Sequence, residues 1–316
     1  MRIGLLGYGN IAKKHVAAIS ELAETEVLAI YDVQAIEPPE GVKSYVDLEQ
    51  FLSQDLDLVT ICSPNGFHKE HSLKALQAGH HVICEKPFAL SSKDCQAMIE
   101  AARIHKKKIY CTMQNRFSPV SQWLHSLVEA QSLGDLYLVN VACYWNRNKG
   151  YYAGSDWRGK LGKDGGTLFT QFSHYVDTLY WLFGKMQIHS AHFANFDHEE
   201  MIEFEDTGIF NFTFDKGGMG TFSYTTSCYE KNFESSLTLI GSKGTVKVGG
   251  QYMDRIDFCN VEGVVPPALS ANDNLSNIRE VYKNAILDIK GQPSAATSAT
   301  DGKAIVELIE KVYAYR

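Results

Sequence analysis

Apolar and polar positions are arranged in two different ways along the chain, and the change comes near residue 117. Before it, short continuous apolar runs alternate with stretches of helical periodicity. Such apolar runs are typical of strands buried on both faces of a parallel sheet. Residues 1–117 are therefore predicted to form an α/β domain with a doubly wound parallel sheet. The predicted strands are 2–6, 27–31, 56–62, 81–84 and 109–112, and the predicted helices are 11–22, 45–52, 68–78 and 92–106.

After residue 117, extended segments separated by glycine turns replace this alternation. Hairpin turn chemistry is present at 216–218 and 242–244. We expect residues 118–316 to form an α+β domain with a large, mainly antiparallel open sheet. Its predicted strands are 136–144, 188–196, 207–214, 219–226, 233–240 and 245–248, and its predicted helices are 166–183, 274–289 and 299–315.

A glycine-rich turn lies between the first predicted strand and the first predicted helix. Gly7 permits a tight turn, Gly9 lets the backbone approach a pyrophosphate, and the helix begins at Asn10 and Ile11 with free N–H groups. Asp32, at the end of the second strand, can accept hydrogen bonds from ribose hydroxyls and would repel a 2′-phosphate. Glycines also end strands for steric reasons alone. The full strand–turn–helix context nevertheless predicts a dinucleotide site that prefers NAD(H) to NADP(H).

The strand 81–84 ends in Glu85-Lys86-Pro87, which brings a carboxylate, an amine and a rigid turn to one strand end. Ligands of open α/β sheets bind outside the carboxyl ends of the strands. Pro87 fixes its own φ and favours an extended Lys86, which would aim the amine at that crevice. Taken alone, the tripeptide fits equally well a strand that ends at a proline beside a solvated Lys86.

Composition and charge narrow the class of protein. The 316 residues exceed what one compact core usually holds, and 45% hydrophobic and 21% charged residues are ordinary for a globular protein. A net charge of −7 gives no electrostatic footprint for nucleic acid. We expect no membrane span, because no run of apolar residues is long enough. The first strand begins at once and leaves no room for a signal peptide, so we expect a cytoplasmic protein.

The cysteines and histidines show no metal or disulfide pattern. Seven cysteines are scattered and never form a Cys-x-x-Cys pair, which indicates reduced, mostly buried thiols of a cytosolic protein. His68 and His71 are three residues apart near a helix start, but no third ligand follows at a recognisable spacing. We therefore expect no metal site.

Taken together, these motifs resemble the Gfo/Idh/MocA oxidoreductases, which include glucose–fructose oxidoreductase and inositol dehydrogenase. The resemblance spans nearly the whole chain and rests on the glycine-rich turn, the loop 63–68, Glu85-Lys86-Pro87, and Gly165-Gly166 followed by His174. It implies a Rossmann domain, a C-terminal sheet for substrate binding and subunit contacts, and NAD(P)-dependent chemistry at a sugar-type carbinol. The predicted cofactor-binding residues are Gly7, Gly9, Asn10, Ile11, Asp32, Ser63, Asn65, His68, Glu85 and Lys86.

The resemblance makes Lys86 and His174 the catalytic candidates for reversible hydride transfer between nicotinamide and a secondary hydroxyl. A base must take the hydroxyl proton, and a histidine with an ordinary pKa suits that role. Lys86 can polarise the oxygen, or share the base role if burial depresses its pKa. Without the resemblance, His174 would more simply be a core histidine of an amphipathic helix.

The position four residues before His174 separates branches of the family. Many members carry an Asp there, whereas this chain has Thr170, which cannot be a charged partner; Asp177 is the alternative orienter. This neutral position, with the arginines upstream, is similar to UDP-N-acetylglucosaminuronate 3-dehydrogenases. Arginine forks suit a sugar carboxylate or a diphosphate, although Arg116 is equally a candidate for a domain-hinge ion pair. The candidate substrate residues are Arg116, Arg147, Trp157, Arg158, Thr170 and Asp177.

Two alternatives remain open at this level. A free-sugar or inositol dehydrogenase would need no diphosphate site. A non-catalytic NAD(H)-binding protein could keep the same fold, since fold does not fix function, although the presence of Lys86 and His174 argues against it. We expect a small-molecule sugar as partner, no nucleic acid and no membrane. We also expect a homodimer or homotetramer formed through the C-terminal sheet, because an open sheet face usually needs a partner.

Overall fold

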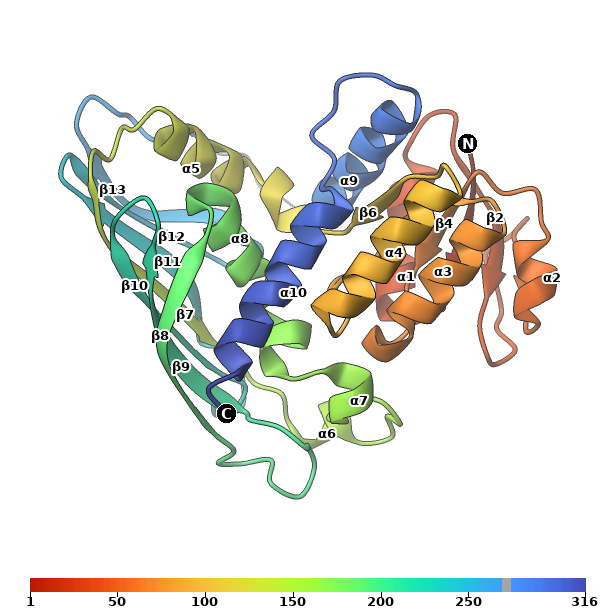
Figure 1. Cartoon of the computed structure of the whole chain (residues 1–316), viewed down its shortest axis with the longest axis horizontal. Helices are drawn as coiled ribbons and strands as arrows, with labels where there is room; N and C mark the ends of the chain where they lie inside the picture. Colours follow the sequence, from red (N-terminus) through yellow and green to blue (C-terminus); the bar gives the residue numbers. More distant parts are fainter. Residues whose placement is uncertain (269–273) are drawn as a thin grey trace. The chain divides into compact units, whose positions relative to one another are not determined.

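The computed structural model describes residues 1–268 and 274–316, which group into two compact units. The first unit contains Met1–Gln114 and Asn274–Glu307, and the second contains Asn115–Asp273 and Leu308–Arg316 (Figure 1). None of the helices in the described ranges combines the length and apolarity that crossing a bilayer requires. All seven cysteines are free thiols, and five of them are buried.

The first unit is built on a six-stranded parallel sheet in the order β3-β2-β1-β4-β5-β6. The chain runs outward from β1 in one direction through β2 and returns to add β4 on the other side, so the strand order reverses between β1 and β4. Ligands bind at such a switch point in open α/β sheets. The strands are β1 (Arg2–Leu6), β2 (Glu26–Tyr31), β3 (Lys43–Tyr45), β4 (Leu58–Ile61), β5 (His81–Cys84) and β6 (Ile109–Cys111).

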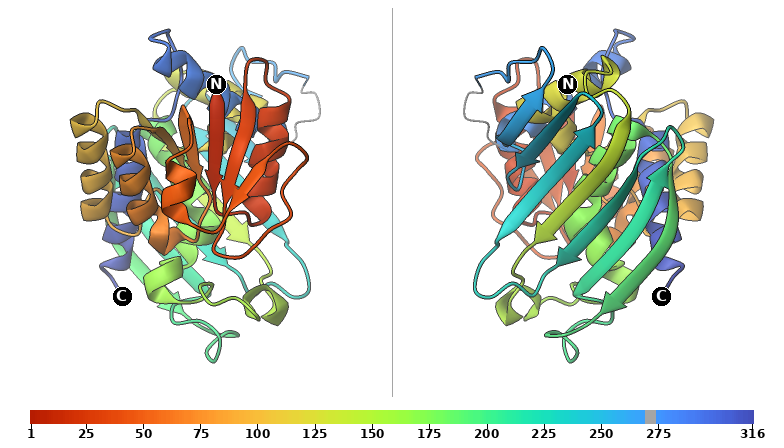
Figure 2. Two further views of the ribbon diagram at one scale, coloured as in Figure 1. Left: turned by 90° about the vertical axis from the view of Figure 1, so that its right-hand side faces the viewer. Right: turned by 90° about the vertical axis from the view of Figure 1, so that its left-hand side faces the viewer.

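Helices cover both faces of this sheet. On one face α1 (Asn10–Ser20) packs against α9 (Asn274–Ile289), and on the other α3 (His68–Gln77) packs against α4 (Ser92–Ile104) (Figures 1 and 2). Because both faces are covered, β1 and β4 are buried almost throughout, which explains their continuous apolar sequence. The short α2 (Leu48–Leu52) begins later than predicted, because Asp47 caps it by accepting a hydrogen bond from the Gln50 amide.

The C-terminal segment contributes to the first unit as well. Tyr282 of α9 is fully buried, and its hydroxyl lies 2.9 Å from the Thr60 hydroxyl of β4. At the start of α10 (Ala299–Tyr313), a Cβ added at Gly302 would lie 2.9 Å from the Cys111 side chain. The sequence analysis assigned everything after residue 117 to the second domain. That division stays a prediction. In the structure, residues 274–307 group with the first unit through long-range contacts, which local sequence patterns do not record.

The second unit is built on a seven-stranded sheet in the order β13-β12-β11-β7-β10-β9-β8. Only β7 and β10 run parallel among these pairs, and the other neighbours are antiparallel. The predicted combination of a doubly wound parallel sheet with a mainly antiparallel one is therefore confirmed. The strands are β7 (Leu136–Tyr144), β8 (Met186–Ala194), β9 (Thr207–Phe214), β10 (Met219–Thr225), β11 (Glu234–Gly241), β12 (Gly244–Gly249) and β13 (Arg255–Val261).

The two faces of the second sheet differ. Phe210, Phe222 and Tyr224 point to one face and are buried beneath α5 (Pro119–Glu129) and α8 (Ser173–Phe183), where Phe172 packs on Tyr224. The opposite face, seen in the right-hand view of Figure 2, has no helix of the described residues over it. Its side chains alternate with the buried ones, as expected for a sheet packed on one side only.

Several elements were not predicted. The strand β13 lacks an apolar–polar alternation, β3 has three residues, and α6 (Lys149–Tyr152) and α7 (Leu161–Asp164) are single turns. The helix α5 was missed although Ser118 caps it and Pro119 starts it. The predicted helix 166–183 is two elements, a π-helical turn (Leu168–Phe172) followed by α8.

Candidate functional site

The glycine-rich turn leaves the N-terminal end of α1 open. Gly7 has a φ of +94°, and an added Cβ would lie 2.8 Å from the backbone nitrogen of Ser63. Gly9 is the N-cap, and a Cβ added there would meet no heavy atom of the described residues within 4 Å. The first turn has no side-chain cap and no acidic residue. The amides at Asn10 and Ile11 can therefore bind an anion, which the helix dipole favours, and a dinucleotide pyrophosphate fits these features.

Asp32 is anchored beside this turn. Its half-buried carboxylate accepts one hydrogen bond from the Tyr8 amide at 2.8 Å and another from the Gln34 amide at 3.1 Å. The two oxygens are thus held in a fixed direction at the end of β2. From this position a carboxylate can accept hydrogen bonds from a ribose, as the sequence predicted.

A buried histidine ties together the loops that follow β4 and β5. The ring nitrogens of His68 lie 2.7 Å from the Pro87 carbonyl oxygen and 2.9 Å from the Ser63 carbonyl oxygen. Burial lowers the pKa of His68. Asn65, also buried, begins the short turn between these contacts. His68 thus braces the two loops that carry Asn65 and Lys86, while a direct contact of His68 or Asn65 with a cofactor stays a prediction.

Ser63 and His71 form a second contact in this region. The hydroxyl of Ser63 lies 2.8 Å from Nδ1 of His71, and burial lowers the pKa of His71 to about 4. Among the described residues, no cluster of three or more histidine, cysteine or acidic side chains could hold a metal ion.

Glu85 is the buried member of the Glu85-Lys86-Pro87 turn. It is 4% exposed, and its Oε2 accepts the backbone N–H of Lys86 at 3.1 Å. Its Oε1 lies 2.8 Å from Nε2 of His15, a fully buried histidine of α1. Lys86 itself is half-buried, and its peptide bond to Pro87 is cis. Lys86 therefore leaves β5 from a backbone that a buried carboxylate holds.

In the second unit, His174 and Thr170 stand out from their surroundings. From residue 167 to residue 179 they are the two half-buried positions, and every other residue is buried. Their spacing of four residues places them on one side of the chain, across the π-helical turn, and such turns are frequent at functional sites. The Thr170 hydroxyl donates to the Asp164 carbonyl at 3.0 Å and also contacts the Asp164 carboxylate.

Arg116 and Asp177 form a buried ion pair. Nε and Nη2 of Arg116 donate to the Asp177 carboxylate at distances between 2.6 and 3.1 Å. The Arg116 guanidinium also lies 5.8 Å from the ring centre of Trp181. Both residues belong to the second unit, so this ion pair lies within that unit, and the hinge role considered for Arg116 stays a prediction. Roles for Asp177 as an orienter of His174 and for either residue at the substrate stay predictions.

Arg147 and Arg158 flank the ring of Tyr151. Their guanidinium carbons lie 5.2 and 4.6 Å from the centre of that ring, and Arg147 also lies 4.7 Å above Trp145. Arg147 donates from Nε to the Gln171 side chain at 2.7 Å, and Arg158 donates to the Tyr151 carbonyl at 3.1 Å. Arg158 further lies 5.4 Å from the ring of the predicted site residue Trp157.

Neither arginine forms an ion pair with a carboxylate of the described residues. Nε of Arg158 is a buried donor without a hydrogen-bond partner among the described residues. Burial lowers the pKa of Arg147. Buried donors are normally paired, so these two side chains are suited to an anionic group from outside the chain.

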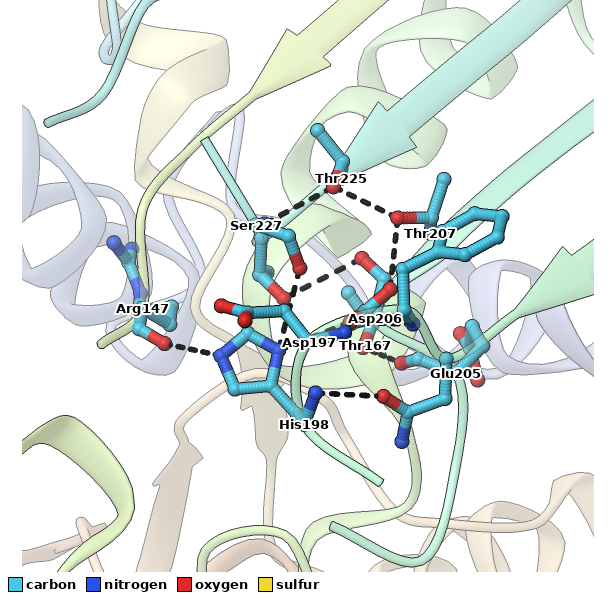
Figure 3. A network of polar contacts seen from close by, with 12 residues as sticks. Arg147, Thr167, Asp197, His198, Glu205, Asp206, Thr207, Thr225 and Ser227 are labelled. Carbon is cyan, nitrogen blue, oxygen red and sulfur yellow. Dashed lines mark hydrogen bonds and ion pairs between the residues drawn. The ribbon is translucent and has the colours of Figure 1, made fainter. Parts of the chain in front are cut away.

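A buried His–Asp pair fixes the backbone at Arg147 (Figure 3). Nε2 of His198 lies 2.7 Å from the Arg147 carbonyl oxygen, and Nδ1 lies 3.1 Å from the Asp206 carboxylate. Asp206 also accepts the amides of Phe196 and Asp197. Burial alone would lower the pKa of His198, but the Asp206 carboxylate and the Arg147 carbonyl raise it overall.

Several of these residues were not predicted from the sequence. No local pattern marks Tyr151, Asp164 or the His198–Asp206 pair. The one usable signal was Gly165-Gly166, because both have a positive φ and turn the chain so that Asp164 returns to Thr170. The remaining contacts join residues that the sheet brings together from distant segments.

Comparison with known families matches both parts of the chain. Residues 1–113 match the family model described as an oxidoreductase family with an NAD-binding Rossmann fold. Residues 121–247 match the model of the GFO/IDH/MocA C-terminal domain.

Two solved structures are similar to the whole chain. The WlbA dehydrogenase from Bordetella pertussis, in complex with NADH and UDP-GlcNAcA, is 30% identical with a TM-score of 0.91, over 100% of this chain and 95% of that chain. The WlbA dehydrogenase from Chromobacterium violaceum, in complex with the same two molecules, is 31% identical with a TM-score of 0.89, over 100% and 93%. The D-glucoside 3-dehydrogenase of Escherichia coli (strain K12) is 24% identical over 341 residues, which cover 99% of this chain and 94% of that protein.

Proposed function

Because the chain belongs to the Gfo/Idh/MocA family of NAD-dependent oxidoreductases, we propose that it oxidises or reduces a secondary hydroxyl of a nucleotide-linked, negatively charged sugar. A UDP-linked uronic acid is the substrate class that fits best. The family sets the reaction class, a nicotinamide-dependent dehydrogenase acting on a CH–OH group, and the cofactor is NAD. The substrate and the roles of individual residues are the proposal.

The observation that carries the proposal is the pair of arginines around Tyr151. Two guanidinium groups contact the same tyrosine ring, at 5.2 and 4.6 Å from its centre, and neither has an acidic partner among the described residues. The Nε donor of Arg158 is buried and unsatisfied there. Leaving charged donors partly buried and unpaired costs stability, and a bound carboxylate or diphosphate would offset this cost. A free sugar or an inositol carries no charge that could do so.

A cleft lies near one arginine of this pair, although neither arginine is among the residues that line it. The cleft of about 360 Å³ lies next to Arg147 and is lined by Trp145 and Asn232, both of which contact the Arg147 guanidinium. Its size is within the range of small-molecule pockets. The WlbA relatives bind UDP-GlcNAcA, which has a sugar carboxylate and a diphosphate for two arginines to bind.

The residues have distinct proposed roles in the reaction. The nicotinamide, when bound, supplies the hydride acceptor or donor. Asp32 binds the ribose, and the α1 N-terminus with Gly7, Gly9, Asn10 and Ile11 binds the pyrophosphate. The loops of Ser63, Asn65 and His68 support the nicotinamide end, as does Glu85. His174 holds the proton that leaves the substrate hydroxyl, and Lys86 polarises the same oxygen.

We also propose that the protein assembles as a homodimer or homotetramer through the open face of the second sheet. Leu138, Ile209, Met219 and Phe258 are exposed on that face. Exposed apolar side chains on an uncovered sheet favour a symmetric contact between copies. A cytoplasmic location is the further proposal, and the seven free thiols are in keeping with it.

Replacing the arginines one at a time tests the substrate proposal. In Arg147→Gln and Arg158→Gln, kcat/KM for UDP-GlcNAcA should fall about 30-fold or more, because a charged pair with the substrate is lost. The NADH dissociation constant should stay within about twofold of the unchanged protein. The matched control is Arg103→Gln, an exposed arginine of α4 paired with Glu100, which should change neither value. An unchanged kcat/KM for UDP-GlcNAcA in both arginine variants would overturn the proposal.

A further inference from the structure

We propose that His15 and Tyr282 are positioning residues for Lys86 and act on it through the buried carboxylate of Glu85. The inference rests on the role proposed above for Lys86 in the dehydrogenase reaction. It adds two residues that lie outside the sequence motif and, in the case of Tyr282, near the other end of the chain.

The four side chains form one continuous buried chain inside the first unit. Nε2 of His15 lies 2.8 Å from Oε1 of Glu85, and Nδ1 of His15 lies 2.8 Å from the Tyr282 hydroxyl. That hydroxyl lies 2.9 Å from the hydroxyl of Thr60. His15, Thr60 and Tyr282 are each 0% exposed, so no water competes for these contacts at the surface. This series of hydrogen bonds joins α1, α9, β4 and the end of β5.

The chemistry of the groups sets the direction of the hydrogen bonds. An ionised carboxylate only accepts, so Nε2 of His15 donates to Glu85. If the imidazole is neutral, Nδ1 then accepts from the Tyr282 hydroxyl, whose oxygen accepts from Thr60. Burial raises the pKa of Tyr282, which keeps its hydroxyl protonated and able to donate. Each member therefore fixes the proton position of the next, and the carboxylate is the end of the chain.

The carboxylate transmits this order to the backbone of Lys86. One Glu85 oxygen is held by His15, and the other accepts the Lys86 N–H at 3.1 Å. Rotation of the carboxylate would break one of these two bonds. Fixing the carboxylate thus fixes the peptide plane from which the Lys86 side chain departs. Residues that hold a functional group in its productive geometry through hydrogen bonds commonly lower activity when they are replaced.

A purely structural role is the competing explanation, and Tyr110 provides a matched control for it. Tyr110 is a buried tyrosine of β6 whose hydroxyl donates to Asp288 of α9 at 2.6 Å. Tyr282→Phe and Tyr110→Phe each remove one hydroxyl that tethers α9 to the sheet. Only Tyr282 belongs to the chain that ends at Glu85, so only its variant should affect Lys86.

The experiment compares kcat, the NADH dissociation constant and thermal stability in the full-length protein. Tyr282→Phe should lower kcat about fivefold to 20-fold with the NADH dissociation constant within about twofold. Tyr110→Phe should leave kcat within about twofold of the unchanged protein. The two variants should lower the melting temperature by similar amounts. Equal losses of kcat in both variants, or a loss in neither, would overturn the proposal.

A double-mutant cycle and a chemical readout separate positioning from general damage. In a Glu85→Gln background, Tyr282→Phe should lower kcat by less than about twofold, because the two changes act on one path. His15→Gln, which keeps a donor toward Glu85, should retain more kcat than His15→Leu. Reductive ¹³C-methylation should give a Lys86 signal, in protein without cofactor, that shifts in Tyr282→Phe and not in Tyr110→Phe. Fully additive effects together with an unshifted signal would contradict the proposal.

Lys86→Met distinguishes a failure of this inference from a failure of the function beneath it. If Lys86→Met retains full activity, the role of Lys86 is wrong and positioning has no target. If Lys86→Met is inactive but Tyr282→Phe is unchanged, the function stands and the positioning role is wrong.

Discussion

The buried and half-buried charged residues of the second unit divide into those with an oppositely charged partner and those without one among the described residues. Arg116 and Asp177 neutralise each other in a buried bidentate pair, and His198 and Asp206 do the same beside the Arg147 backbone. Arg147 and Arg158 have no opposite charge among the described residues. The paired groups maintain the fold, whereas the unpaired arginines are suited to an anionic ligand.

The His198–Asp206 pair should make stability depend on pH. The pKa of His198 is raised above its ordinary 6.5, so its contribution is full below about pH 6.5 and is lost as pH rises through the raised pKa. Burial alone would raise the pKa of Asp206, but the hydrogen bonds that its carboxylate accepts lower this pKa below the ordinary 3.8. The ion pair is therefore fully formed between the lowered pKa of Asp206 and the raised pKa of His198. His198→Asn should cost about 2 kcal/mol of unfolding free energy near pH 6, and less above pH 8.

Urea unfolding across this pH range measures the effect. His189→Asn is the control, because His189 is exposed on β8 and contacts a hydroxyl, Thr213, in place of a carboxylate. The control should lose little stability and show no such trend. A cost for His198→Asn that stays constant from pH 6 to pH 9 would show that the ion pair does not explain the stability.

At the scale of single elements, the N-terminus of α1 has a shape that serves a ligand more than the fold. Gly7 is required by the backbone, since its φ is +94° and Ser63 leaves no room for a side chain. Gly9 is different, because a side chain there would meet no described atom and its φ is −76°. The fold therefore gives no reason for glycine at position 9, whereas a bound pyrophosphate does.

Gly9→Ala should accordingly separate stability from cofactor binding. The unfolding free energy should change by less than about 1 kcal/mol, and the NADH dissociation constant should rise about tenfold or more. Gly162→Ala is the matched control, since Gly162 also has open space and no positive φ but lies in α7. Urea unfolding gives the unfolding free energy, and titration with NADH followed by fluorescence gives the dissociation constant. Unchanged NADH binding in Gly9→Ala would place the pyrophosphate elsewhere.

The elements also show where prediction from sequence succeeds. Continuous apolar runs predicted β1, β4 and β5 because both faces of those strands are covered. The strand β13 escaped prediction because its side chains follow no regular alternation of burial. At the site, the motif residues Gly7, Asp32 and Lys86 could be named because local spacing identifies them. Tyr282 and His198 could not, because their partners are far away in the sequence and only the fold brings them together.

At the scale of the whole molecule, the two units carry different halves of the proposed chemistry. The first offers a dinucleotide site at the switch point of its sheet, and its C-terminal helix α9 anchors the residue next to Lys86 through Tyr282. The second offers His174 and the two arginines that contact Tyr151, which we propose bind the anionic part of the substrate. The family relationship extends over both units, since one family model matches residues 1–113 and the other residues 121–247.

The measurement that tests the central claim most directly is the nicotinamide absorbance of the purified protein mixed with NAD and a panel of sugars. A 2-oxo acid is included in a parallel series, so that a cofactor that stays bound can be turned over. UDP-GlcNAcA should reduce the cofactor with a kcat/KM at least about tenfold above that of UDP-GlcNAc, and free sugars and inositol should be slower still. Reduction by a free sugar or inositol without reduction by UDP-GlcNAcA would contradict the account.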